Sequence, residues 1–433
     1  MSIGILTIAI ILLVIMIIGI GTPIAFGLGF LGLIGIVSFL DMNVLYQIAE
    51  ISVTTGTNLF MITLPLFILM AEVVSVSGVG DDMYTAAHRW LSWLPGGLSI
   101  ASIATCTGFG AICGSSPATA ATIGVISIPE MIKRGYSKHL AVGAVAAGGT
   151  LGILIPPSIT MVIYGVITQT SIGKLFMAGI IPGIVVASIM SAAIVIAVIM
   201  KPALAPPVVG VTWRQRFSSL KRVWAFVVLV LSIIGTIYTG IATPTESAAI
   251  GATVAIFIAL SYGRLTLRTL HAALLSSVAV TAMIMFMVIG GGTMAFLLST
   301  LGIPQYVTGL ITSLEVSRWS VMIIINIVLI VMGCLLDPMA ILIISLPILF
   351  PIVTELGFDP IWFGIVITIN VEIGMITPPF GLNLFILNGA VKGITMKDII
   401  VGSLPFVFLL MVGLGVIMAF PDLSTWLPAK MGF

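Results

Sequence analysis

The chain has 433 residues, of which 60% are hydrophobic and only 7% are charged, and its formal net charge is +2. Soluble domains carry about 25% charged residues, so this composition excludes a soluble globular protein and indicates a helical protein that crosses a membrane many times. A transmembrane barrel would instead show segments of about 10 residues with strict alternation, and none occur. Cys106, Cys113 and Cys334 lie in apolar surroundings and predict neither a disulfide nor a metal site.

Ten apolar segments are long enough to cross a membrane, which takes about 20 apolar residues. In chain order they lie at about 3–18, 24–40, 56–76, 140–166, 177–199, 223–239, 247–262, 275–298, 360–388 and 400–419. The first of them has no cleavage motif and is predicted to be retained. The stretches 97–132 and 319–353 are interrupted by Gly, Pro and polar residues, so we predict two re-entrant helical hairpins. The spans at 140–166 and 360–388 each contain glycines and a double proline and are predicted to be broken helices.

Two polar segments between the spans predict elements at the membrane surface. Segment 80–95 mixes charged residues with Trp90, Leu91, Trp93 and Leu94, which is typical of an amphipathic helix lying at the interface. Segment 211–222 in the central loop is basic and predicts a short surface linker.

The second half of the sequence repeats positions of the first half at an offset of 221 or 222 residues. The matched pairs are Gly19/Gly240, Thr22/Thr243, Pro23/Pro244, Ser77/Ser299, Gly80/Gly302, Pro129/Pro351, Gly135/Gly357, Gly152/Gly374, Pro156/Pro378 and Pro157/Pro379. Chance agreement among 46 glycines and 22 prolines is the alternative, and the nearly constant offset argues against it. We therefore predict two homologous domains, 1–210 and 221–433, each with five spans and one hairpin.

Basic residues in short loops predict which side of the membrane each loop faces. The central loop contains five of them and no acidic residue, namely Lys201, Arg214, Arg216, Lys221 and Arg222, and is predicted to be cytoplasmic. Five spans precede this loop and five follow it, so both termini are predicted to be periplasmic. An odd number of spans in each half makes the two halves inverted repeats.

The tip of the first hairpin is small, polar and rich in oxygen. Its residues are Gly114, Ser115, Ser116, Pro117 and Thr119. Hydroxyl and carbonyl oxygens coordinate hard cations, and the helix that begins near Pro117 directs its partially positive N-terminus into the same place. The tip is therefore predicted to hold a cation and to contact an anionic substrate.

The break in the first broken helix is predicted to complete this cation site. It runs from Gly148 through Pro156, Pro157 and Ser158, and the oxygen-bearing or small residues in it are Gly149, Thr150 and Gly152. Backbone groups freed at membrane depth must be satisfied by protein, water or an ion, and matched interrupted segments in two halves point to a transporter's binding site. Packing by small residues with simple proline kinks is the alternative for each motif.

The second hairpin and the second broken helix offer a comparable set of ligands. Gly333, Asp337 and Pro338 lie at the tip, and Gly374, Thr377, Pro378 and Asn383 lie around the break. They predict a second cation site that has a carboxylate, a hydroxyl and an amide oxygen. Asp337 has an equally good alternative role as the cap of the following helix. The residues predicted to contact substrate are Ser116, Pro117, Ser158, Pro338, Thr377, Pro378 and Asn383.

Glu72 and Glu372 lie inside predicted spans, where a carboxylate is a functional candidate by default. Glu372 is the stronger candidate because it is two residues from Gly374, whereas Glu72 fits a structural role equally well. No Lys or Arg falls inside any predicted span. An anionic substrate would therefore be held by helix N-termini, hydroxyls and the bound cations, which couples cation binding to substrate binding.

Motifs for other activities are absent from the sequence. It has no G-x-x-x-x-G-K-[ST] motif for a nucleotide, so ATP is not expected to drive the protein, and no nucleic-acid partner is expected. It has neither H-E-x-x-H nor G-x-S-x-G. An intramembrane hydrolase that uses Asp337 and Glu372 is a weak alternative, because these residues lie on different predicted elements without a nucleophile motif.

Several stretches resemble the large membrane subunit of TRAP transporters, the tripartite ATP-independent periplasmic secondary carriers. These are GIGTPIAFGLGFLG from Gly19, GFGAICGSSPATAATIGVISIPEM at 108–131, GGTLGILIPPS at 148–158, DPMAILIISLPILFPI at 337–352 and EIGMITPPFGLNLF at 372–385. The resemblance covers nearly the whole chain. There is also a distant similarity to elevator-type dicarboxylate/sodium carriers.

The resemblance implies a sodium-coupled importer of organic acids, such as C4-dicarboxylates or sialic acid, in the bacterial inner membrane. Its partners would be a small four-helix membrane subunit, as a separate chain, and a periplasmic substrate-binding protein. The hairpin domain would slide against a scaffold as an elevator. Ser115, Ser116 and Thr119 with the first break would frame one sodium site, and Gly333, Asp337 and the second break another. The alternative is a related cation-coupled carboxylate carrier that needs no binding protein.

Overall fold

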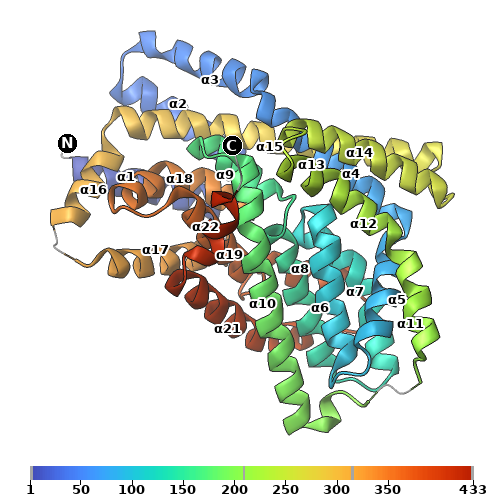
Figure 1. The fold of residues 1–433 in the computed structure, drawn as a ribbon. Helices are drawn as coiled ribbons and strands as arrows, with labels where there is room; N and C mark the ends of the chain where they lie inside the picture. The colour runs from blue at the N-terminus through green and yellow to red at the C-terminus, as the bar shows by residue number, and fades with distance from the viewer. Residues whose placement is uncertain (1–2, 208–209, 314–315, 431–433) are drawn as a thin grey trace.

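The computed structural model describes residues 3–207, 210–313 and 316–430, and every regular element in these ranges is a helix (Figure 1). The first half contains α1 (Ile3–Gly19), α2 (Ile24–Phe39), α3 (Tyr46–Thr57), α4 (Thr63–Ser77), α5 (Val79–Leu91), α6 (Gly97–Cys113), α7 (Ser116–Lys133), α8 (Lys138–Leu154), α9 (Ile159–Thr168) and α10 (Ile172–Met200). The all-helical class predicted from composition is confirmed.

In the described ranges the second half contains twelve α-helices where the first contains ten. It contains α11 (Trp213–Leu220), α12 (Trp224–Val230), α13 (Thr236–Tyr238), α14 (Pro244–Ser261), α15 (Leu267–Thr300), α16 (Ile303–Ser313), α17 (Arg318–Gly333), α18 (Pro338–Glu355), α19 (Pro360–Met375), α20 (Leu382–Ala390), α21 (Met396–Ala419) and α22 (Asp422–Ala429). Short 3-10 turns and one π-helical turn at Leu231–Gly235 join some of them.

Within the described ranges, seven helices are long and apolar enough to cross a membrane, or eight if the bent pair α8 and α9 counts as one span. Of the ten predicted spans, α1, α2 and α19 are shorter apolar helices. Helix α18, which lies in the predicted hairpin 319–353, is instead among the seven long ones. Helix α15 begins at Leu267, eight residues before its predicted start. The helices α3 and α16 were not predicted, since neither has a long apolar run.

The helices pack in two groups. Helix α2 lies along α15 and α4 lies along α14, at the upper edge of the view in Figure 1. Below them α6 and α7 pack on α8, α17 and α18 pack on α19, and α21 packs on α8. Buried apolar side chains fill this second group, and α8 is buried at every position from Ala141 to Leu154.

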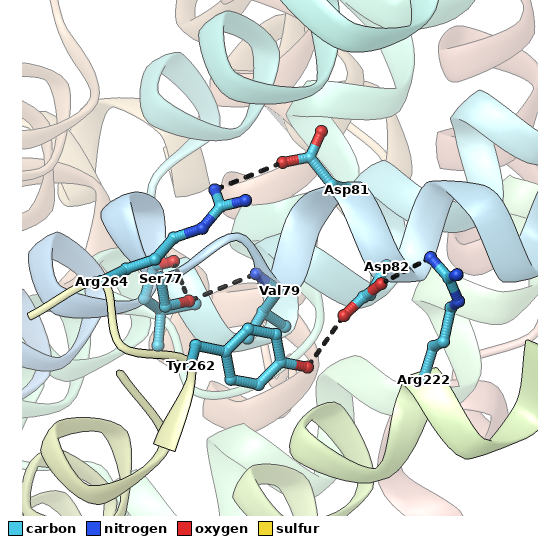
Figure 2. Close-up of polar contacts among 8 residues, drawn as sticks. Ser77, Val79, Asp81, Asp82, Arg222, Tyr262 and Arg264 are labelled. Carbon is cyan, nitrogen blue, oxygen red and sulfur yellow. Dashed lines mark hydrogen bonds and ion pairs between the residues drawn. The ribbon is translucent and has the colours of Figure 1, made fainter. Parts of the chain in front are cut away.

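The chain passes from one group to the other at the joint between α4 and α5. Gly78 has a left-handed backbone there, with φ of 88°, which side chains other than glycine rarely adopt. Figure 2 shows how the first turn of α5 is anchored: Asp82 lies 3.3 Å from the Arg222 guanidinium and accepts a 2.9 Å hydrogen bond from Tyr262, and Asp81 faces Arg264 at 3.9 Å. Burial and the bond to Asp82 raise the pKa of Tyr262 to about 12, so its hydroxyl keeps the proton that it donates at neutral pH.

Candidate functional site

Both predicted broken helices are broken in the structure at the proline pairs. Helix α8 ends at Leu154 and α9 begins at Ile159, with a bend of 40° between them. Helix α19 ends at Met375 and α20 begins at Leu382. The bonds Pro156–Pro157 and Pro378–Pro379 are both cis. Each interruption therefore lies at a proline pair, inside a span that was predicted to be broken.

The glycines predicted to belong to the breaks lie inside continuous helix instead. Gly149, Thr150 and Gly152 are part of α8, and the Thr150 hydroxyl donates to the Ala147 carbonyl one turn earlier. A Cβ on Gly152 would lie 2.7 Å from the Gly110 Cα, and one on Gly149 would lie 2.8 Å from the Ala120 Cβ. These residues are small because α6 and α7 approach α8 closely, so the assignment of residues 148–152 to the break was wrong.

In the second half, too, a glycine predicted to belong to the break lies inside a helix. Gly374 lies in α19, and a Cβ there would be 2.3 Å from the Gly333 Cα on α17. Gly333 and Gly374 therefore form a close helix crossing. Thr377 and Pro378 do lie in the break, where the Thr377 hydroxyl donates to the Ile373 carbonyl.

The tip of the first hairpin joins α6 to α7 and lies against the first break. Gly114 turns the chain with φ of 61°, and a Cβ on it would lie 3.0 Å from the Pro157 carbonyl oxygen. Ser115 caps α7 and accepts from the Ala118 N–H at 3.5 Å, while the Thr119 hydroxyl donates to the Ser115 carbonyl at 2.8 Å. Pro117 sits in the first helical turn, which needs no N–H from it.

The first tip also meets the second broken helix. The Asn383 side-chain N–H of α20 donates a 2.6 Å hydrogen bond to the Ser116 hydroxyl of α7, and both residues are fully buried. Within the described residues, the Asn383 side-chain oxygen has no hydrogen-bond partner. Ser116 and Asn383, which the sequence analysis chose from two different motifs, are 267 positions apart in the sequence, and this hydrogen bond joins them. Ser158, which caps α9 by accepting from the Met161 N–H, lies across the break from α8.

The tip of the second hairpin shows which role Asp337 takes in this structure. Its carboxylate caps α18 by accepting from the N–H groups of Met339 and Ala340 at 3.0 and 3.2 Å. Pro338 follows at the first helical position. The capping role is therefore present, and in the described residues no hydrogen bond joins this tip to Ser116.

The two intramembrane carboxylates have different surroundings. Glu72 accepts a 2.7 Å hydrogen bond from Ser276 and so links α4 to α15. Glu372 is fully buried in α19, and neither of its oxygens has a hydrogen-bond partner among the described residues. A buried polar group without a partner costs about 1–3 kcal/mol, so Glu372 is the more unusual of the two.

One buried polar pair in the structure was not predicted from the sequence. The Asn370 side chain of α19 donates to the Asn326 side-chain oxygen of α17 at 2.5 Å and to the Val366 carbonyl. Each asparagine is a polar residue within an otherwise apolar stretch of helix. This feature of the sequence could have identified them. The pair fixes the first arm of the second hairpin to the broken helix.

The oxygens gathered here suit a cation better than a softer metal. Hydroxyl, amide and backbone carbonyl oxygens are ligands for hard cations. No group of three or more His, Cys, Asp or Glu side chains that could hold a transition metal occurs in the described part of the chain. The site could bind a small hard cation beside a polar ligand.

A polytopic helical protein with apolar hairpins and two interrupted helices meeting in its interior has the architecture of a secondary membrane transporter. The chain belongs to the family of the tripartite ATP-independent periplasmic transporter, DctM component, whose sequence model matches residues 9–423. Proteins of this family are transporter permeases and not enzymes.

Two curated relatives illustrate the similarity. The chain is 39% identical over 380 residues to the C4-dicarboxylate TRAP transporter large permease protein DctM of Pseudomonas aeruginosa, covering 87% of this chain and 88% of that protein. It is 34% identical over 379 residues to the isethionate TRAP transporter permease protein DctMQ of Oleidesulfovibrio alaskensis, covering 86% of this chain and 58% of that longer protein. The crystal structure of the Alcanivorax borkumensis YdaH transporter has a similar fold, with a TM-score of 0.56 at 15% identity over 89% of this chain and 91% of that one.

Proposed function

We propose that this chain is the permease subunit of a sodium-coupled importer that moves an organic acid delivered by a periplasmic substrate-binding protein. The observation that carries the proposal is the buried contact between Ser116 and Asn383, which joins the first hairpin tip to the second broken helix. The family supports transport, and the substrates named for the relatives support an organic acid such as a C4-dicarboxylate.

The charge distribution supports coupling between cation and substrate. No Lys or Arg is buried anywhere in the part of the chain that the structure describes, so an anion in the interior lacks a fixed cationic side chain. The N-terminus of α7, capped at Ser115, supplies only a partial positive charge. Bound sodium ions would supply the remaining positive charge, and the carboxylate would therefore bind weakly without them.

We also propose that the two halves are inverted repeats and that the protein works as an elevator. Support comes from the same order of hairpin, broken helix and long helix in both halves (α6 to α10 and α17 to α21), the paired breaks at Pro156 and Pro378, and the reciprocal packing of α2 on α15 and of α4 on α14. The group built on α8 and α19 would move against the group built on α14 and α15. Gly78, at the joint between α4 and α5, is a natural point for the chain to bend.

The proposed partners follow from the family. A small membrane subunit and a periplasmic binding protein would complete the importer, and the greater length of the isethionate relative fits a protein that carries such a subunit fused. We place the complex in the bacterial inner membrane with both termini in the periplasm. The second candidate, a stand-alone carboxylate carrier, differs only in needing no binding protein.

Uptake by proteoliposomes tests the proposal. The chain would be reconstituted with its small membrane subunit, and uptake of labelled succinate and of other carboxylates would be measured with and without the binding protein and an inward sodium gradient. We expect uptake only when both are present. Uptake without the binding protein would favour the stand-alone carrier, and equal uptake with sodium or potassium outside would refute sodium coupling.

A further inference from the structure

The short helix α11 is held to the body of the protein by one face only. A capping box formed by Thr212 and Gln215 starts the helix. Arg89 and Trp90 of α5 donate hydrogen bonds to the Gln215 and Arg216 carbonyls at 3.3 and 3.1 Å. At the far end, Arg222 pairs with Asp82 of α5 (Figure 2). Helices α5 and α11 therefore lie side by side, as Figure 1 shows.

Large apolar side chains along α11 and at the first residue of α12 remain exposed beside this contact. Two of them are partly covered, because the Phe217 ring meets Trp90 of α5 edge-on at 5.7 Å and the Trp224 ring stacks on Tyr262 at 6.1 Å. Trp213, Phe217, Leu220 and Trp224 have exposed fractions of 65%, 60%, 48% and 43%. The spacing of four and three residues places the first three on one side of α11, and Trp224 follows at the start of α12 after a 3-10 turn. Such a stripe is costly in water, because large apolar side chains gain free energy when they are removed from it. The stripe therefore requires an apolar environment.

Basic side chains border this stripe. At about 100° per residue, the exposed residues Arg214 and Lys221 fall together on one side of it and Arg216 falls on the other. The Arg216 guanidinium lies 4.6 Å from the centre of the Trp213 ring. No Asp or Glu occurs in the sequence between Glu130 and Glu246, so the positive charge of this segment is not offset locally.

The position of α11 in the chain indicates which apolar environment it meets. The stretch from Trp213 to Tyr238, which begins with α11 and continues through α12 and α13, is long and apolar enough to cross a membrane. The aromatic and basic residues therefore stand at the end of a membrane span, where lipid headgroups lie. Aromatic residues beside Lys and Arg are the composition that binds such an interface.

We propose that the outer face of α11 binds anionic phospholipid headgroups, with Trp213, Phe217 and Trp224 at the boundary between headgroups and acyl chains and with Arg214 and Lys221 on the phosphates. Positive charge next to a span attracts anionic lipid, so the site prefers phosphatidylglycerol to zwitterionic lipid. Helix α11 is tied to α5 by the Arg222–Asp82 ion pair and by the hydrogen bonds that α5 donates to its backbone carbonyls. Lipid binding to α11 therefore also restrains the motion of α5 at the joint between the two helix groups. This inference does not depend on sodium coupling or on the transported acid.

Hydrogen exchange of the full chain in nanodiscs tests this site. Exchange of the 213–222 amides would be compared in phosphatidylethanolamine mixed with phosphatidylglycerol and in the same lipid mixed with phosphatidylcholine. We expect several-fold slower exchange with phosphatidylglycerol, and this difference should disappear in the double variant Arg214→Gln/Lys221→Gln. The matched control is Lys133→Gln/Lys138→Gln, which removes the same charge from exposed positions elsewhere and should keep the difference.

Three outcomes would overturn the proposal. Equal exchange in the two lipid mixtures would show that headgroup charge does not matter. Equal behaviour of the two double variants would show that Arg214 and Lys221 are not the contacts. Protection that appears only when the small membrane subunit is added, in either lipid mixture, would show that a protein covers this face.

Discussion

Sodium-dependent uptake is expected to be lost in the variant Ser116→Leu. The Ser116 hydroxyl is fully buried and accepts the hydrogen bond from Asn383. Leucine removes this oxygen, leaves the Asn383 amide unpaired at a cost of about 1–3 kcal/mol, and adds bulk to a closely packed site at a similar cost. We expect uptake to fall by about tenfold or more, since each 1.4 kcal/mol changes an equilibrium about tenfold, with no remaining activation by sodium.

The control for this variant is Ser188→Leu, which makes the same change on an exposed face of α10 and should leave uptake near the wild-type value. Asp337 can be examined in the same assay, because Asp337→Asn retains an oxygen that can cap α18 but removes the charge. A higher sodium requirement in Asp337→Asn would assign Asp337 to a cation site, and an unchanged one would leave it as a cap. Normal sodium activation in inserted Ser116→Leu would contradict the assignment of the first tip.

A second large effect is expected from Gly374→Ala. A Cβ at this position would lie 2.3 Å from the Gly333 Cα and 2.5 Å from the Gly333 carbonyl carbon. These are backbone atoms, so α17 must move away from α19 and carry the second hairpin with it. Overpacking of this kind costs about 1–3 kcal/mol, and we expect a clearly lower thermal midpoint of the purified protein in detergent, together with reduced uptake.

Gly415→Ala is the matched control for that substitution. Gly415 also lies in a helix, α21, but nothing is within 4 Å of the position of its added Cβ. Alanine is favoured over glycine by about 0.5–1 kcal/mol inside a helix, so this variant should be as stable as the wild type or slightly more stable. Similar losses in Gly374→Ala and Gly415→Ala would show that the contact with Gly333 does not matter.

The hairpins and the broken helices could be predicted from sequence because their signals are local. Proline removes a backbone donor and kinks or breaks a helix. Single prolines such as Pro182 and Pro405 are accommodated inside helices here, whereas the proline pairs at Pro156 and Pro378 located the breaks. The glycines near them were harder to interpret. Gly152 and Gly374 serve close helix crossings, and a glycine that allows two helices to approach looks the same in sequence as one that loosens the backbone.

Long-range contacts and polar helices could not be derived in the same way. Ser116 and Asn383 were each chosen for their chemistry, but nothing local indicates that α7 and α20 pack together. Helix α3 was overlooked because its residues, YQIAEISVTTGT, lack the apolar run by which spans are recognised. The role of Asp337 required coordinates, since capping and cation binding use the same carboxylate oxygens.

The central claim is that a sodium ion binds where the first hairpin tip meets the second broken helix, and the most direct measurement of it is the thermal midpoint of the purified protein in increasing sodium chloride. Choline chloride would hold the ionic strength constant. A ligand that binds only the folded state raises stability in proportion to the logarithm of its concentration, so we predict a midpoint that climbs with sodium in the wild type and stays flat in Ser116→Leu. A wild-type midpoint that is the same in sodium and in choline would contradict the claim.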